Sequence, residues 1–336
     1  MREFNISNKI FIRSNNSSSK MLLRYTYVLI LFVVFISGYL MFNSDTLLLI
    51  DFIKTLFIVT FTGILFQYII NITRGKKELL KLFTEDNIIA SSIIITLFAF
   101  KEKLVVGFIA IIISQIVKLF NRNISISSSL YGILFILIYS QYFNNLDTPL
   151  INFSNLDYSG TVHDVIFKYG NFISFVLGTN LIYLSPILCI ISFIYLFFKK
   201  SIKYPVVFSY LLVFIFSMLI IGFANGMSIW FLFFQLVTGN VLFFTIFTLT
   251  DYKVSPITYE GGVIYGMIIS LISIILRFII PELSVVIAMI IGQLFIVNYI
   301  NKISYKLKYN RKFYRIIFTS CVILSIVSII IISLVY

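Results

Sequence analysis

Long uninterrupted apolar segments follow one another along almost the whole chain. A helix rises about 1.5 Å per residue, so about 20 apolar residues cross the roughly 30 Å hydrocarbon core of a bilayer. Continuous runs of this length exclude a membrane β-barrel, whose strands alternate in polarity. The mean hydropathy of +1.04 and the low share of charged residues, 12%, also exclude a soluble enzyme, a secreted disulfide scaffold and a disordered chain. The sequence predicts an all-α polytopic membrane protein.

We expect ten core transmembrane helices and one extra C-terminal helix. The expected helices are 22–42, 47–71, 88–100, 103–120, 126–143, 181–198, 203–222, 228–250, 262–280, 284–300 and, as the extra helix, 315–336. The chain is thereby divided into a cytoplasmic N-terminal segment at 1–21, a first transmembrane half at 22–143, an external loop at 144–180, a second transmembrane half at 181–300, and a basic inner loop with the extra helix at 301–336.

The basic residues indicate the orientation, because cytoplasmic loops carry an excess of Lys and Arg. With the N-terminus inside, most of the 26 basic residues lie in inner segments, and only Lys101, Lys103 and Lys168 lie in outer ones. The loop 144–180 is therefore expected outside. The net charge of +13 does not indicate nucleic acid, because these residues lie between apolar segments rather than along one face.

The number of helices predicts an inverted repeat. Five helices before the long loop and five after it place the two halves in the membrane in opposite orientations, as in many transporters. The third helix of each half is unusual: 88–100 is short, and 228–250 is interrupted at Gly239-Asn240. Interruptions at matching positions indicate a site near the membrane midplane. A packing glycine and a tilted short helix explain the same pattern equally well.

Two stretches resemble a known family. Residues 11–21 read F-I-R-S-N-N-S-S-S-K-M and resemble the H-I-R-S-x-x-S-x-x-x-I-M opening of the RnfD/NqrB family. Residues 250–258 read T-D-Y-K-V-S-P-I-T and are similar to the family's T-D-x-x-x-S-P-x-T. Further matches follow this second stretch: Gly261, Ile264-Tyr265-Gly266, Arg277 and Pro281-Glu282.

The resemblance implies a ten-helix subunit of a redox complex in the bacterial inner membrane, with other subunits and membrane lipid as its partners. Such complexes couple electron transfer to Na⁺ or H⁺ movement, with FMN joined to a threonine through a phosphoester at D-x-x-S-G-A-T. The corresponding residues here are Asp157, Ser159, Gly160 and Thr161, with a spacing two residues shorter and no alanine. The resemblance thus implies covalent FMN on Thr161.

A second group of candidates lies around the T-D-Y-K-V-S-P-I-T stretch. Pro256 lacks an N–H and restricts Ser255, so the chain is expected to leave the helix there and expose carbonyls near Asp251. We therefore take Asp251, Ser255, Thr258 and Gly239 as candidates for an ion or redox path, because hard cations bind oxygen ligands. A helix C-terminal turn closed by Ser-Pro is equally consistent with this sequence.

Other polar residues receive more ordinary interpretations. Asp51 and Lys54 are expected to form an interfacial salt bridge, and Arg277 and Glu282 an outer-edge pair. One histidine and two cysteines within apolar runs predict no metal site. The basic segment 301–315 is suited to anionic lipid or a partner subunit.

The leading hypothesis is an integral subunit of an Rnf/Nqr-like ion-translocating oxidoreductase, a translocase subunit rather than a stand-alone enzyme. The chain has no nucleotide-binding loop and no iron–sulfur cysteine pattern, so NADH oxidation would take place on another subunit. The alternatives are a flavin-free channel or carrier, and a structural membrane subunit, on the same inverted-repeat scaffold.

Overall fold

The computed structural model describes residues 18–42, 44, 46–73, 88–120, 127–143, 185–224, 230–237, 240–251, 255–256, 258–280 and 283–306. Within these ranges the chain forms helices joined by turns and contains no β-strand. Five helices are long and apolar enough to cross a membrane, and four shorter apolar helices accompany them. The predicted all-α membrane architecture is therefore confirmed, whereas the expected extra helix at 315–336 lies outside the described residues.

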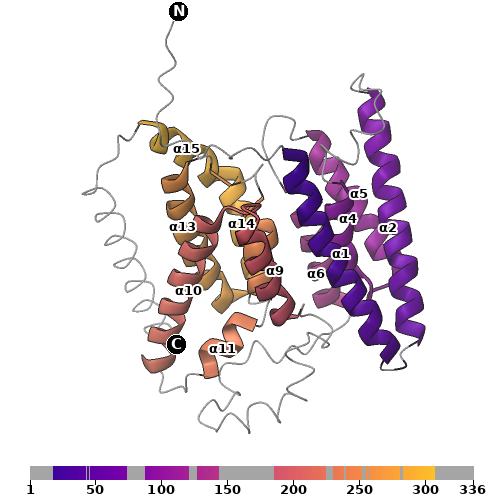
Figure 1. Cartoon of the computed structure of the whole chain (residues 1–336), viewed down its shortest axis with the longest axis horizontal. Helices are drawn as coiled ribbons and strands as arrows, with labels where there is room; N and C mark the ends of the chain where they lie inside the picture. The colour runs from indigo at the N-terminus through magenta and orange to yellow at the C-terminus, as the bar shows by residue number, and fades with distance from the viewer. Residues whose placement is uncertain are drawn as a thin grey trace, which may run out of the picture. The chain divides into compact units, whose positions relative to one another are not determined.

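The helices fall into two compact units, which we call the N-terminal and C-terminal units. The N-terminal unit contains α1 (Ser18–Phe42), α2 (Thr46–Thr73), α4 (Ile88–Ala99), α5 (Leu104–Phe120), α6 (Ser129–Phe143) and α9 (Pro186–Phe198) (Figure 1). Helix α9 follows the long loop in the chain, yet it packs against α1. Its start is set by Pro186 at the first turn and by Ser185, whose Oγ accepts the Leu188 N–H at 3.4 Å.

Helix α2 shows why these segments fold as membrane helices. It buries a stripe of residues spaced three or four apart, so that the stripe follows one helix face. The buried residues are Phe52, Thr55, Val59, Gly63, Gln67, Ile70 and Asn71. The opposite face is equally apolar and exposes Phe57, Phe61 and Leu65, which suits contact with lipid rather than water. Polar and small residues thus lie inside, as expected for helix contacts within a bilayer.

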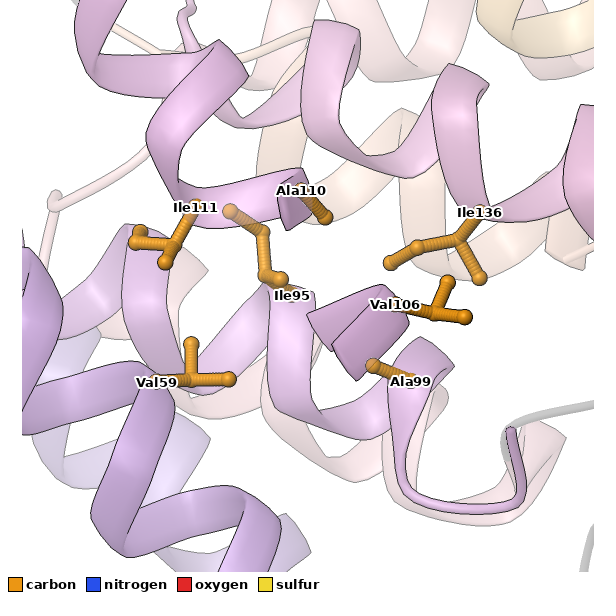
Figure 2. Close-up of a cluster of buried hydrophobic side chains, with 7 residues drawn as sticks. All are labelled: Val59, Ile95, Ala99, Val106, Ala110, Ile111 and Ile136. Atoms are coloured by element: carbon orange, nitrogen blue, oxygen red, sulfur yellow. The ribbon is translucent and has the colours of Figure 1, made fainter. Parts of the chain in front are cut away.

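The core of the N-terminal unit lies where α2, α4, α5 and α6 meet. Figure 2 shows Val59 of α2, Ile95 and Ala99 of α4, and Ile136 of α6 gathered around three residues of α5. Alanine and the small Gly107 of α5 keep these backbones close, because larger side chains would separate them. Helix α4 has 12 residues, about 18 Å of helix, so the predicted short third helix is confirmed.

The C-terminal unit contains α10 (Tyr204–Ala224), α11 (Trp230–Val237), α12 (Val241–Phe243), the π-helix η2 (Phe244–Thr248), α13 (Tyr259–Ile279), α14 (Ser284–Ile291), the π-helix η3 (Gly292–Ile296) and α15 (Val297–Lys306). Helices α10 and α13 lie side by side (Figure 1). Their contacts run in the same chain direction, from Tyr204 against Tyr259 to Phe214 against Arg277, so the two helices are parallel.

Candidate functional site

The candidate site residues separate into those that the structure describes and those that it does not. Thr161, Asp157, Ser159 and Gly160 lie outside the described residues, and so does Gly239. Asp251, Ser255 and Thr258 are described and lie between η2 and α13 in the C-terminal unit. We call residues 248–262 the corner, because the chain ends one helix there and starts the next.

The helix before the corner is broken, as the sequence predicts. Helix α11 ends at Val237, and Asn240 adopts a left-handed conformation with φ 54° at the start of α12. Five residues of π-helix follow, from Phe244 to Thr248. Single-turn π segments occur mostly as bulges inside helices and are frequent at functional sites. The third helix of the second half is therefore interrupted twice, by the turn at Asn240 and by the bulge.

Ser255 closes the end of this broken helix. Its backbone N–H and its Oγ both donate to the Asp251 carbonyl, at 2.9 and 2.8 Å. Upstream, Thr250 Oγ1 donates to the Ile246 carbonyl at 2.5 Å. The Ser255 hydroxyl thus serves the backbone of the corner, which agrees with the interpretation of this stretch as a helix C-terminal turn closed by Ser-Pro.

Thr258 begins the next helix. It has an extended backbone, and its Oγ1 accepts the Gly261 N–H at 3.0 Å, which is the geometry of a helix N-cap. A Cβ at Gly261 would lie 2.6 Å from this oxygen and 3.1 Å from Pro256, so the glycine keeps the cap compact. Asp251 itself is partly buried at the end of the broken helix.

The carbonyls that Pro256 was expected to expose are occupied by a lysine. The ammonium of Lys203, which lies just before α10, donates to the carbonyls of Ser255 and Pro256 at 3.0 and 2.8 Å. Lys203 is only 8% exposed. Sequence reasoning counted this lysine among the inner basic residues and missed its contact. The only available signal in the sequence is its position at the start of the apolar segment 203–222.

A second polar cluster lies further along α13. Arg277 is 2% exposed and donates through Nε to Gln235 Oε1 at 2.6 Å and through Nη2 to the Gln235 carbonyl at 3.1 Å. Its guanidinium carbon also lies 5.8 Å from the ring centroid of Phe214. Arg277 is thus tied to a glutamine of α11 deep in the unit, and Glu282, its expected partner, lies outside the described residues.

The N-terminal unit has a related cluster. Lys118 of α5 donates to Gln67 Oε1 of α2 at 2.7 Å, and Gln67 Nε2 donates to Asn71 at 3.0 Å. One turn away, the side-chain amide of Gln115 is 1% exposed and has no hydrogen-bond partner among the described residues. Each cluster therefore contains one cation that donates to a glutamine of a neighbouring helix.

One of the remaining expectations, the Asp51–Lys54 pair, can be compared with the structure. Lys54 and Asp51 form the expected ion pair at 4.0 Å, with side chains 59% and 60% exposed. Such an exposed pair contributes little to stability. Among the described residues, no group of three or more His, Cys, Asp or Glu side chains is arranged to hold a metal ion.

The comparisons with known proteins extend over most of the chain. The model of the NQR2, RnfD, RnfE family matches residues 5–310. No curated protein sequence matches the chain. The match takes in residues of both units, Thr161, and the corner.

Proposed function

The chain belongs to the NQR2, RnfD, RnfE family, and from this premise we propose that it carries electrons through a covalently bound FMN and couples their passage to Na⁺ or H⁺ movement. Membership makes it a membrane subunit of an Rnf/Nqr-type complex, with the other subunits of that complex as partners. The observation that carries the proposal is the length of the family match, which leaves only the first four residues and the last segment uncovered.

Thr161 is the residue that we propose for flavin attachment. A phosphoester needs a hydroxyl, which Thr161 provides, and Gly160 before it lets a flavin-transferring enzyme approach the backbone closely. Asp157 and Ser159 complete the counterpart of the family motif. The basic residues place this loop outside, on the side opposite to the cytoplasm. No described residue is needed for this proposal, which rests on the motif and on the family.

Covalent flavin is tested by fluorescence. The full chain is expressed with a flavin transferase and separated by denaturing electrophoresis, where a covalently bound flavin stays with the protein. We expect a fluorescent band that is lost in Thr161→Ala. Ser154→Ala is the matched control, because it removes a hydroxyl of the same loop outside the motif and should stay fluorescent. A dark wild-type band beside a fluorescent, known flavinylated protein would remove FMN and favour a flavin-free carrier or a structural subunit.

Internal repetition supports an inverted-repeat scaffold. Residues 104–120 of α5 and 263–279 of α13 align without gaps, as L-V-V-G-F-I-A-I-I-I-S-Q-I-V-K-L-F and V-I-Y-G-M-I-I-S-L-I-S-I-I-L-R-F-I. This register matches Gly107 with Gly266 and Lys118 with Arg277. Lys118 and Arg277 are the cations of the two polar clusters, and each donates to a glutamine.

The next helices repeat as well. Residues 132–139 read G-I-L-F-I-L-I-Y and residues 292–299 read G-Q-L-F-I-V-N-Y, so five of eight positions are identical. Gly132 faces the Ala110 carbonyl of α5, and Gly292 faces Tyr265 of α13. In both cases, therefore, the glycine packs against an earlier helix, α5 or α13, which in turn packs against α2 or α10, respectively. With five helices expected in each half, an odd number, the repeats would enter the membrane from opposite sides.

We place the proposed ion path at Asp251, which follows the interrupted helix of the second repeat. The Ser255 and Thr258 hydroxyls cap the backbone, so the Asp251 carboxylate is the candidate group for a cation.

The substitution Asp251→Asn tests this path, because it keeps the shape of the side chain and removes its charge. In proteoliposomes containing the whole complex, we expect it to lower redox-driven ion uptake at least tenfold, with normal insertion. Asp51→Asn, which removes an exposed carboxylate, should leave uptake unchanged. Normal uptake in Asp251→Asn would reduce the corner to a packing motif.

A further inference from the structure

Lys203 is a buried cation that donates to two backbone oxygens. Its ammonium lies 3.0 Å from the Ser255 carbonyl oxygen and 2.8 Å from that of Pro256, and the residue is 8% exposed. Both distances fall in the ordinary range for N–H···O hydrogen bonds. A charged group is removed from water only where partners replace its hydration, and here carbonyl dipoles do so.

The corner explains why two carbonyls converge there. Ser255 and Pro256 lie between the end of η2 and the start of α13, and neither of these two residues is helical. The carbonyls therefore have no partner in a helix and must find a donor or a cation. Adjacent carbonyl oxygens in non-helical backbone are also the ligands with which channels and transporters replace the hydration shell of monovalent cations.

We propose that the carbonyls of Ser255 and Pro256 form a monovalent-cation site that the chain fills with the ammonium of its own Lys203. The tethered ammonium connects the start of α10 to the backbone between η2 and α13 and keeps free cations out of the site. Removal of the lysine side chain opens the site to ammonium, methylammonium or potassium ions. The distance from the cation to each oxygen is that of an N–H···O hydrogen bond. This distance suits ammonium, methylammonium and potassium better than the smaller sodium ion.

This inference goes beyond the proposed function and does not depend on it. It assigns the Ser255 and Pro256 carbonyls to an internal cation, so an ion that passes Asp251 does not use them while Lys203 is in place. It needs no flavin, no partner subunit and no transport activity. Its test can therefore fail while the proposed function holds, and the reverse is also true.

The test measures the thermal unfolding of the purified full chain in detergent. Wild type and Lys203→Ala are compared in choline, sodium, potassium, ammonium and methylammonium chloride at equal ionic strength. In choline chloride we expect the midpoint of Lys203→Ala to fall by roughly 5–10 °C, because two charge-assisted hydrogen bonds are lost. Ammonium or methylammonium should restore at least half of this loss, whereas the wild-type midpoint should be the same in all five salts.

Lys118→Ala is the matched control. Its ammonium donates to a side-chain oxygen, Gln67 Oε1 at 2.7 Å, so its removal should lower the midpoint without recovery in any particular salt. A midpoint of Lys203→Ala that is equal in all salts, or equal to that of the wild type, overturns the proposal. If Lys203→Ala does not fold, Lys203→Met retains an apolar side chain of similar length and removes the charge. A Lys203→Met protein as stable as the wild type would also overturn it.

Discussion

Gly266 of α13 lies against the backbone of α10. A Cβ at this position would lie 2.5 Å from the Val206 carbonyl oxygen and 3.1 Å from the Tyr210 nitrogen. Both are backbone atoms, which cannot turn away as a side chain can, so the helices would have to separate. We predict that Gly266→Ala lowers the free energy of unfolding by about 1–3 kcal/mol. Thermal unfolding in detergent measures this change.

Gly38 of α1 is the matched control for this prediction. Nothing lies within 4 Å of a Cβ built there, so Gly38→Ala should be neutral or slightly stabilising, since alanine favours helices over glycine. Equal stability of Gly266→Ala and wild type would show that α10 and α13 are not packed as closely as described.

Individual residues also mark what could be predicted from the sequence and what could not. The pairing of Asp51 with Lys54 was predictable because both lie on one helix face three residues apart. The partners of Arg277 and Lys203 were not predictable, because Gln235 and Ser255 lie 42 and 52 residues away from them in the chain. The chemistry at Ser255-Pro256 was also only partly predictable. The Ser-Pro pair indicates carbonyls without a helical partner, but it does not indicate that a lysine would donate to them.

At the scale of elements, Asn240 separates α11 from α12 with a left-handed backbone at φ 54°. This region of conformational space costs an alanine roughly 1–2 kcal/mol and a glycine almost nothing. We therefore predict that Asn240→Gly is more stable than Asn240→Ala, with a free energy of unfolding higher by about 1 kcal/mol. Thermal unfolding in detergent measures this difference as a higher unfolding temperature of Asn240→Gly. Ile275, an exposed position within α13, is the control and should show the opposite order: Ile275→Ala should be more stable than Ile275→Gly. Alanine variants that are more stable than the glycine variants at both positions would contradict the left-handed turn.

The elements themselves followed from the sequence to different degrees. Apolar length predicted the long helices, and flanking charges around 88–100 predicted the short α4. The Gly-Asn pair predicted the break in the helix at 228–250. The two π segments were not predictable, because Phe244–Thr248 and Gly292–Ile296 read as ordinary apolar helix. A π turn arises where packing against other helices holds one extra residue in a turn. The local sequence does not specify this packing.

At the scale of the whole molecule, the distribution of charge predicts the topology. The segments expected inside carry most of the 26 basic residues, and the segment 301–315 alone holds six of them within fifteen residues. The transfer of such a segment across the membrane is strongly disfavoured, whereas the loop 144–180 carries one lysine and can cross. The orientation is therefore a prediction from the sequence, while the position of the two units relative to each other depends on contacts that charge does not specify.

The predicted topology has a direct test in intact cells. In a background without Cys189 and Cys321, a cysteine is placed either at Asn155, in the expected outer loop, or at Lys308, in the expected inner loop. We expect an impermeant thiol reagent to label Asn155→Cys in intact cells and Lys308→Cys only after the membrane is permeabilised. Labelling of both variants after permeabilisation is the control that each thiol is reactive. The opposite pattern, with Lys308→Cys labelled in intact cells and Asn155→Cys protected, would invert the topology. It would then move Thr161 to the cytoplasmic side, where a flavin transferase acting outside the membrane could not reach it.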